Sequence, residues 1–185
     1  MDWVGYAIAA AVVLFAVMTY NGLVRLRARA QQAYADVDVQ LKQRHDLVPN
    51  LVETVKGYAA HERDTLDAVV RARNEAVAAS GPARQATAEA ALNGSLGRLL
   101  ALGEAYPELK ADANFRQLQT DLGEVEDKLA AARRFFNNAV SEYNAAIESF
   151  PAVLFSRPMG FAPREFFDLG EGERGRLAVA PQVRF

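Results

Sequence analysis

The apolar residues of this chain form an uninterrupted run at its start and a regular spacing afterwards. From Trp3 to Val24 there are 22 positions without a charged side chain. A helix needs about 20 apolar residues to cross a hydrocarbon core of roughly 30 Å. The run therefore predicts a transmembrane anchor over residues 1–24. Its membrane-spanning residues include Trp3, Tyr6, Leu14, Phe15, Tyr20 and Val24.

Three arginines, Arg25, Arg27 and Arg29, follow the apolar run, whereas only the α-amino group and Asp2 precede it. Basic residues beside a span stay in the cytoplasm. We therefore expect a single-pass protein with its N-terminus outside and its C-terminal body cytoplasmic. A cleaved secretory signal is the alternative, because residues 28–30 have the small-residue spacing of a cleavage site. The missing basic start and the length of the apolar run argue against it.

The body, residues 25–150, has the composition and spacing of helices. Ala, Leu, Glu, Gln and Arg are frequent, and Gly and Pro gather at a few places. Between these places we predict helices over residues 2–80, 83–105 and 112–149. Pro49 predicts a kink rather than an end, because the apolar spacing resumes after it. The carbonyl of His45, which Pro49 leaves unpaired, needs water or a nearby side chain such as Asn50.

The last predicted helix carries the clearest repeat, an alternation of three and four positions typical of packed bundle helices and coiled coils. Its apolar residues are Phe115, Leu118, Leu122, Val125, Leu129, Ala132, Phe136, Ala139, Tyr143, Ala146 and Phe150. The first predicted helix offers Val37, Leu41, Val48, Val52, Val55, Ala59, Leu66 and Val69, and the second offers Leu92, Leu96, Leu99 and Leu100. We predict an all-α fold in which the transmembrane helix continues into an antiparallel long-helix bundle.

Charge and composition exclude several classes of function. A net charge of −2 gives no indication of nucleic-acid binding, and the absence of cysteine excludes disulfides and thiolate metal sites. His61 and Glu62 begin a zinc-protease motif, but Thr65 stands where the second histidine is needed. We therefore predict no catalytic, cofactor-binding or metal residue. An enzyme or metal protein that uses His61 is the less favoured alternative.

Several short motifs along the chain resemble the LemA family. They are YNGLVRLR at 20–27, AYADVDVQLK at 33–42, RHDLVPNLV at 44–52, VKGYAAHE at 55–62 and PQVRF at 181–185. The resemblance implies a membrane-anchored bacterial protein with a long-helix bundle at the cytoplasmic face of the inner membrane. It implies no defined activity. Because members of the family lie near membrane-bound HtpX-like proteases in some genomes, a regulator or adaptor of such a protease is a further alternative.

Polar and aromatic residues complete the prediction. We expect hydrogen bonds between helices at Asp36, Asp38, Arg44, Asn50, Asn137 and Asn144. The tail, residues 151–185, is rich in Pro, Gly and aromatic residues, and we expect it to matter for assembly through Phe155, Phe161, Phe166 and Phe167. Such side chains need cover from the bundle, another subunit or lipid. The leading hypothesis is a non-enzymatic scaffold in the lipid bilayer that forms a homo-oligomer or binds another membrane protein.

Overall fold

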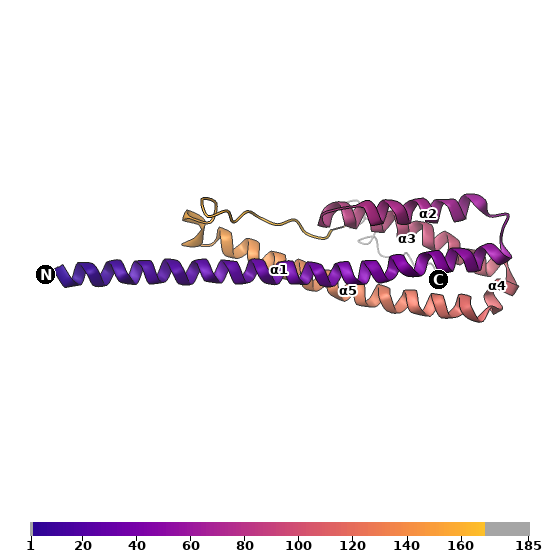
Figure 1. The fold of residues 1–185 in the computed structure, drawn as a ribbon, viewed down its shortest axis with the longest axis horizontal. Helices are drawn as coiled ribbons and strands as arrows, with labels where there is room; N and C mark the ends of the chain where they lie inside the picture. The colour runs from indigo at the N-terminus through magenta and orange to yellow at the C-terminus, as the bar shows by residue number, and fades with distance from the viewer. Residues whose placement is uncertain (1, 169–185) are drawn as a thin grey trace, which may run out of the picture. The chain divides into compact units, whose positions relative to one another are not determined.

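The computed structural model describes residues 2–168, and this part of the chain contains helices and no strand (Figure 1). The predicted all-α fold is confirmed. In chain order the elements are α1 Asp2–Tyr58, α2 Arg63–Ala78, α3 Pro82–Ala105, α4 Pro107–Ala111, α5 Ala113–Glu148 and the 3₁₀ helix η1 Ala152–Leu154.

Two predicted helices match the structure, and one was wrong at its end. Helices α3 and α5 lie within a residue or so of the predicted bounds. Helix α1 continues through Pro49 as predicted, but it ends at Tyr58 instead of residue 80. Residues 59–62 then turn the chain into α2. The short helix α4 was not predicted.

The turn after Tyr58 left no signal in the sequence because the apolar spacing continues through it. Ala59 is fully buried in the turn, and Leu66 of α2 joins the same core as Val55 of α1. Neither proline nor glycine stands within residues 59–62. Side-chain hydrogen bonds hold this corner, from the Tyr58 hydroxyl to the carboxylate of Asp112 at 2.8 Å and from the Tyr106 hydroxyl to that of Glu62 at 3.2 Å.

The described chain divides into two compact units. Unit 1 comprises residues 2–37 and 132–165, and unit 2 comprises residues 38–131 and 166–168. Helices α1 and α5 contribute to both units. The predicted domain boundaries separate the membrane anchor from the bundle at residue 24 and the bundle from the tail at residue 150. The two compact units do not test these boundaries, which stay predictions.

Unit 2 has a core built from α1, α2, α3, α4 and the first part of α5. Its fully buried side chains include Val48, Leu51, Val55, Val69, Leu92, Leu99, Leu109 and Phe115. Gly103 lies against Phe115, where a Cβ atom would be 2.8 Å from the aromatic ring. This glycine therefore permits a close approach of α3 to Phe115.

Unit 1 packs residues 20–37 of α1 against the end of α5 and against a strap, residues 149–165, that follows α5. One core cluster of this unit contains Leu23, Tyr143, Ile147, Ala152 and Phe161. Along the end of α5, the predicted seam residues Phe136, Ala139 and Tyr143 are buried. Phe150, also expected on the seam, is 81% exposed because α5 ends at Glu148 and the helical spacing no longer applies to it.

Candidate functional site

A buried charged cluster in unit 2 is the first candidate site. Arg44 and His45 of α1 and Glu89 of α3 are 3%, 7% and 2% exposed. Charged side chains are almost never fully buried unless they are paired. Arg44 follows Val37 and Leu41 at helical spacing, and Glu89 precedes Leu92 and Leu96 in the same way. The helical stripes that build the core therefore bring these charges together.

The cluster satisfies Glu89 from three directions. One carboxylate oxygen accepts a hydrogen bond from Arg44 Nη1 at 2.9 Å. The other accepts from His45 Nε2 at 2.7 Å and from the side-chain amide of Gln85 at 3.1 Å. Arg44 also donates through Nη2 to the side-chain oxygen of Asn93, and the same nitrogen lies 3.3 Å from the carboxylate of Glu126 on α5. Arg44 thus links α1, α3 and α5 within unit 2.

This environment favours the ionised carboxylate of Glu89. Burial alone would raise the pKa of Glu89, but hydrogen bonding and charge from His45, the charge of Arg44 and the Gln85 hydrogen bond together lower it. An ionised carboxylate accepts hydrogen bonds only. We therefore infer that His45 Nε2 carries a hydrogen and is the donor of the hydrogen bond to the Glu89 carboxylate.

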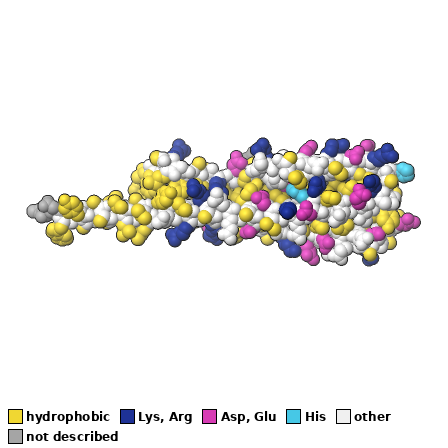
Figure 2. Space-filling view, viewed as in Figure 1, with side chains coloured by type: hydrophobic (Ala, Val, Ile, Leu, Met, Phe, Trp, Pro, Cys, Tyr) yellow, Lys and Arg dark blue, Asp and Glu magenta, His cyan; other side chains and the backbone are white. Residues whose placement is uncertain are grey.

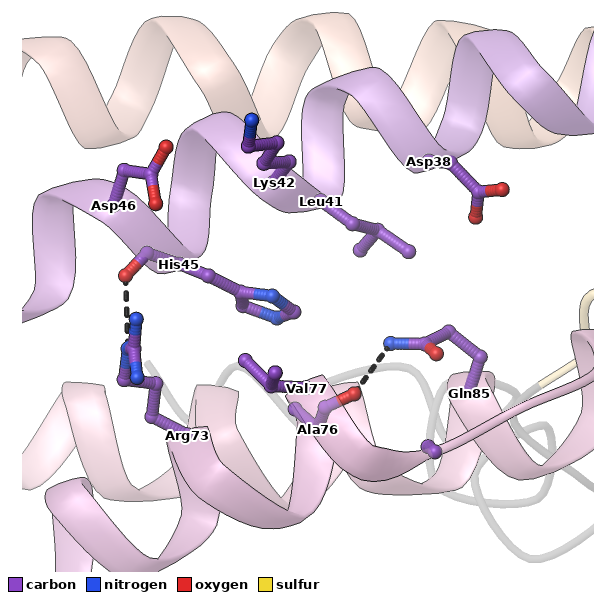
Figure 3. Close-up of a pocket in the computed structure, with 10 residues that line it drawn as sticks. Asp38, Leu41, Lys42, His45, Asp46, Arg73, Ala76, Val77 and Gln85 are labelled. Carbon is purple, nitrogen blue, oxygen red and sulfur yellow. Dashed lines mark hydrogen bonds between the residues drawn. The ribbon is translucent and has the colours of Figure 1, made fainter.

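Pro49, inside α1, is linked to the same cluster. Proline has no N–H group, so the carbonyl of His45, four residues earlier, loses its helical partner. Arg73 of α2 donates a hydrogen bond from Nε to this carbonyl at 3.0 Å (Figure 3). The predicted partner Asn50 was wrong, since Asn50 is exposed and a side chain from the neighbouring helix satisfies the carbonyl.

A cavity of about 360 Å³ opens beside the cluster. Asp38, Leu41, Lys42, His45, Asp46, Arg73, Ala76, Val77, Ala79 and Gln85 line it. The His45 ring points into the space between α1 and α2, whereas Lys42 and Asp46 extend away from α2 (Figure 3). Burial raises the pKa of Asp38. No cysteine, serine or threonine is among the lining residues, and the described chain has no cluster of three metal-binding side chains. The cavity therefore offers side chains of both charges but no hydroxyl or thiol nucleophile.

The residues predicted to join helices have different environments. Arg44 makes such contacts, whereas Asp36 and Asn50 are exposed and Asn137 is half-buried. Asn144 pairs with the strap instead of a helix, since its amide donates to the Arg164 carbonyl at 3.0 Å and accepts from the Arg164 N–H at 2.9 Å. His61 is exposed, but it lies in the turn after α1 and not on a helix.

His45 and Glu89 were missed as interacting residues, although the sequence carried a signal for both. His45 lies four residues after Leu41 and three before Val48, and Glu89 lies four after Gln85 and three before Leu92. Each charged residue therefore stands within an apolar seam. Two oppositely charged residues at seam positions of different helices indicate a buried ionic contact.

The apolar start of α1 is the second candidate site. It is the one described helix that is long and apolar enough to cross a membrane, judged by length and composition. Trp3, Tyr6, Leu14 and Phe15 are all more than half exposed, and hydrophobic side chains cover the start of the helix in Figure 2. In contrast, Val24 is half-buried and packs against the core of unit 1.

Two of the three arginines that follow the apolar run contact neighbouring parts of unit 1. Arg27 lies 5.4 Å from the Phe161 ring centroid and Arg29 lies 5.6 Å from that of Phe135. Arg29 also pairs with Glu142 at 2.8 Å, and Arg25 is exposed. These contacts are all within the chain, so the orientation of the helix in the membrane stays a prediction.

The aromatic residues of the tail are only partly buried. Phe161 and Phe167 are buried, Phe155 is half-buried and Phe166 is 42% exposed. The Phe161 ring meets Tyr20 edge-on at 5.5 Å, so this part of the tail packs on its own chain. The motif at residues 181–185 lies outside the described residues.

Comparison with known proteins finds related sequences, and the first of these are magnetosome proteins named MamQ. The chain is 27% identical over 176 residues to the magnetosome protein MamQ of Magnetospirillum gryphiswaldense, covering 81% of this chain and 65% of that protein. Magnetosome protein MamQ 2 of Paramagnetospirillum magneticum matches with the same identity and coverage. The chain thus spans about two thirds, 65%, of the length of these relatives.

A more distant relative carries the family name itself. Protein LemA of Metamycoplasma hominis is 23% identical over 158 residues, which cover 83% of this chain and 71% of that protein. The model of the LemA family matches residues 33–185, well over half of the chain. The chain belongs to the LemA family.

Proposed function

We propose that this chain is a non-enzymatic, membrane-anchored helical scaffold that presents its bundle to a second copy or to another membrane protein. The observation that carries the proposal is the exposed apolar surface of α1 before residue 20. Monomeric soluble proteins rarely expose contiguous apolar patches larger than a few hundred Å². A bilayer covers such a helix along its length.

The chemistry of the buried cluster supports a structural role over a catalytic one. The Glu89 carboxylate is occupied by protein donors on both oxygens, and Arg44 has acceptors on α3 and α5. A group that is fully paired within the protein is not available to a substrate. Such clusters fix the register of packed helices in well-studied coiled coils.

Self-association is tested most directly in intact membranes, because the chain contains no cysteine. Val39, an exposed apolar residue of α1, is replaced by cysteine, and Gln117→Cys at an exposed polar position of α5 is the matched control. We expect oxidation to give a crosslinked species larger than the monomer at Val39→Cys and not at Gln117→Cys. A strict monomer in detergent, with no crosslinked species and no captured membrane protein, would refute the scaffold.

Orientation and chemistry need two further measurements. Because Arg25, Arg27 and Arg29 follow the span, we expect a reporter fused after Phe185 to be active only as a cytoplasmic fusion. Periplasmic activity would reverse the orientation. The rival class, a metal protein, is tested by metal analysis of the full chain purified without added metal. Stoichiometric zinc or iron would contradict the non-enzymatic proposal.

A further inference from the structure

The strap, residues 149–165, exposes apolar side chains beside the end of the membrane span. Phe150 is 81% exposed and Leu154 is 70% exposed, and Val153 and Met159 are also exposed. All four belong to unit 1, as does the apolar start of α1. None of them packs in the core that Ala152 and Phe161 form with Leu23.

The strap is fastened to α1 where the apolar run ends. Phe161 lies between the ring of Tyr20, at 5.5 Å, and the guanidinium of Arg27, at 5.4 Å. The hydroxyl of Ser156 donates to the carbonyl of Ile147 at 3.1 Å, and the hydroxyl of Tyr143 donates to the carbonyl of Ala162 at 3.0 Å. These contacts hold one side of the strap against α1 and α5, whereas Phe150 and Leu154 lie on its exposed side.

The backbone of the strap satisfies many of its own polar groups. The N–H groups of Val153, Phe155, Ser156, Met159, Gly160 and Phe161 all donate to carbonyls within residues 149–157, at 2.8–3.1 Å. Unpaired backbone groups are expensive where water is scarce. A segment with internally paired N–H groups and outward apolar side chains therefore suits the interfacial region of a bilayer.

Charge on the same surface has the sign that membrane headgroups require. Arg157 is exposed between Leu154 and Met159. On α1, Met18, Asn21, Val24 and Arg25 line a groove that combines apolar walls with a cation. Interfacial segments pair apolar residues with Lys or Arg in this way, since anionic lipids attract the cations.

We propose that the strap is a second membrane contact, which inserts Phe150 and Leu154 into the leaflet that the end of the span crosses. It is a shallow, interfacial contact, and Arg157 and Arg25 lie at the headgroups. The inference rests on the proposed membrane anchor, because the strap is placed by its contacts with Tyr20 and Arg27. The occupant is lipid, since the ring contact between Phe161 and Tyr20 holds the strap against α1 where the apolar run of the span ends.

Tryptophan fluorescence of the full chain in vesicles tests this contact. The chain has one tryptophan, Trp3, so a Trp3→Phe background allows single reporters at Phe150→Trp and Leu154→Trp. Both positions are exposed, so the substitutions leave the core intact. Gln117→Trp, on an exposed part of α5 in unit 2 that the proposed self-association does not involve, is the control. The vesicles contain phosphatidylcholine and phosphatidylglycerol, with bromine near the carbonyl end of the acyl chains.

We expect both strap reporters to emit at shorter wavelength than the control, to lose intensity to the brominated lipids and to resist acrylamide in the water. The Gln117→Trp control should show the opposite pattern. Strap reporters that respond like the control would overturn the proposal. Protection from both quenchers would also overturn it, because it would indicate a protein partner. In the wild-type chain, Trp3 reports on the membrane anchor independently of the strap. If the brominated lipids do not quench Trp3, the anchor is not in the bilayer and the proposed function itself is refuted.

Discussion

The buried cluster around Glu89 gives the sharpest test of how the bundle is held together. Glu89→Gln keeps the size of the side chain but removes the charge that Arg44 and His45 face. The side chains of Arg44 and Glu89 are 4% and 2% exposed, so water cannot replace the lost partner. Removing one member of a buried pair costs about 3–5 kcal/mol. Because Arg44 keeps Glu126 at 3.3 Å, we expect a loss near the lower end, about 3 kcal/mol.

Thermal unfolding of the full chain in detergent micelles, followed by helical circular dichroism, measures this loss. For a chain of this size about 1 kcal/mol corresponds to roughly 2–4 °C, so we expect the Tm to fall by about 6–12 °C. Glu104→Gln, an exposed glutamate of the same helix, is the control and should change the Tm little. A Tm for Glu89→Gln within experimental error of the control would refute the inference that the cluster stabilises the bundle.

The pH dependence of this effect has a definite sign. The pKa of Glu89 lies below its ordinary value of 4.5 in the folded chain, so folding favours the ionised form. The stabilisation is therefore complete above about pH 4.5 and is lost as the pH falls through the folded pKa. The difference in unfolding free energy between wild type and Glu89→Gln should therefore shrink as the pH falls through the folded pKa of Glu89. A difference that grows in acid would contradict the assignment.

Replacing the whole cluster should be milder than breaking it. The triple variant Arg44→Met, His45→Leu and Glu89→Met removes the mutually dependent charges together. Such replacements are often neutral or stabilising, because no uncompensated charge is left buried. We expect the triple variant to be more stable than Glu89→Gln alone, by the same thermal measurement. A triple variant that is less stable would mean that the ionic contacts supply net stability beyond packing.

Three further predictions follow from individual contacts, each measured by thermal unfolding of the full chain in micelles. Gly103→Ala should destabilise the chain by about 1–3 kcal/mol because its Cβ would meet Phe115. Gly97→Ala, with open space around it, should stabilise the chain by about 0.5–1 kcal/mol. Changes in stability of the same sign for both variants would refute the close approach of α3 to Phe115. Phe136→Ala should cost about 3–5 kcal/mol, whereas His61→Ala at the exposed turn should cost under about 0.5 kcal/mol; equal losses would mean that His61 is bound. Phe161→Ala should cost about 3–5 kcal/mol, whereas Phe150→Ala should change the folded bundle little; the reverse order would contradict the packing of the strap.

The apolar spacing was sufficient to predict most of the core. All eight residues that the first predicted helix offered to the seam, from Val37 to Val69, are buried. Spacing predicts which side of a helix faces inward, and that information is local. The turn at residues 59–62 was missed for the same reason, since Ala59 keeps the seam in phase across it.

The contacts of the candidate site depend on residues far apart in sequence. That Pro49 frees the His45 carbonyl follows from proline chemistry, but the donor is Arg73, 28 residues away in the chain. Glu89 lies 44 residues from His45 and was overlooked because isolated charges are usually exposed. Asn144 was expected to reach another helix, yet it pairs with the backbone of Arg164 in an irregular segment. No local pattern specifies such a partner.

The placement of charge and apolar surface bears on how this chain can act. Inside unit 2, the Glu89 carboxylate is paired with Arg44 and with Nε2 of His45, so its charge is compensated within the protein. In unit 1, apolar side chains of the span such as Phe15 and of the strap such as Phe150 and Leu154 are more than half exposed. Uncovered apolar surface drives association, whereas satisfied buried charge does not. We therefore infer that the chain acts through the surfaces that it presents to lipid and to other proteins, and that its buried cluster holds the helices that carry those surfaces in register.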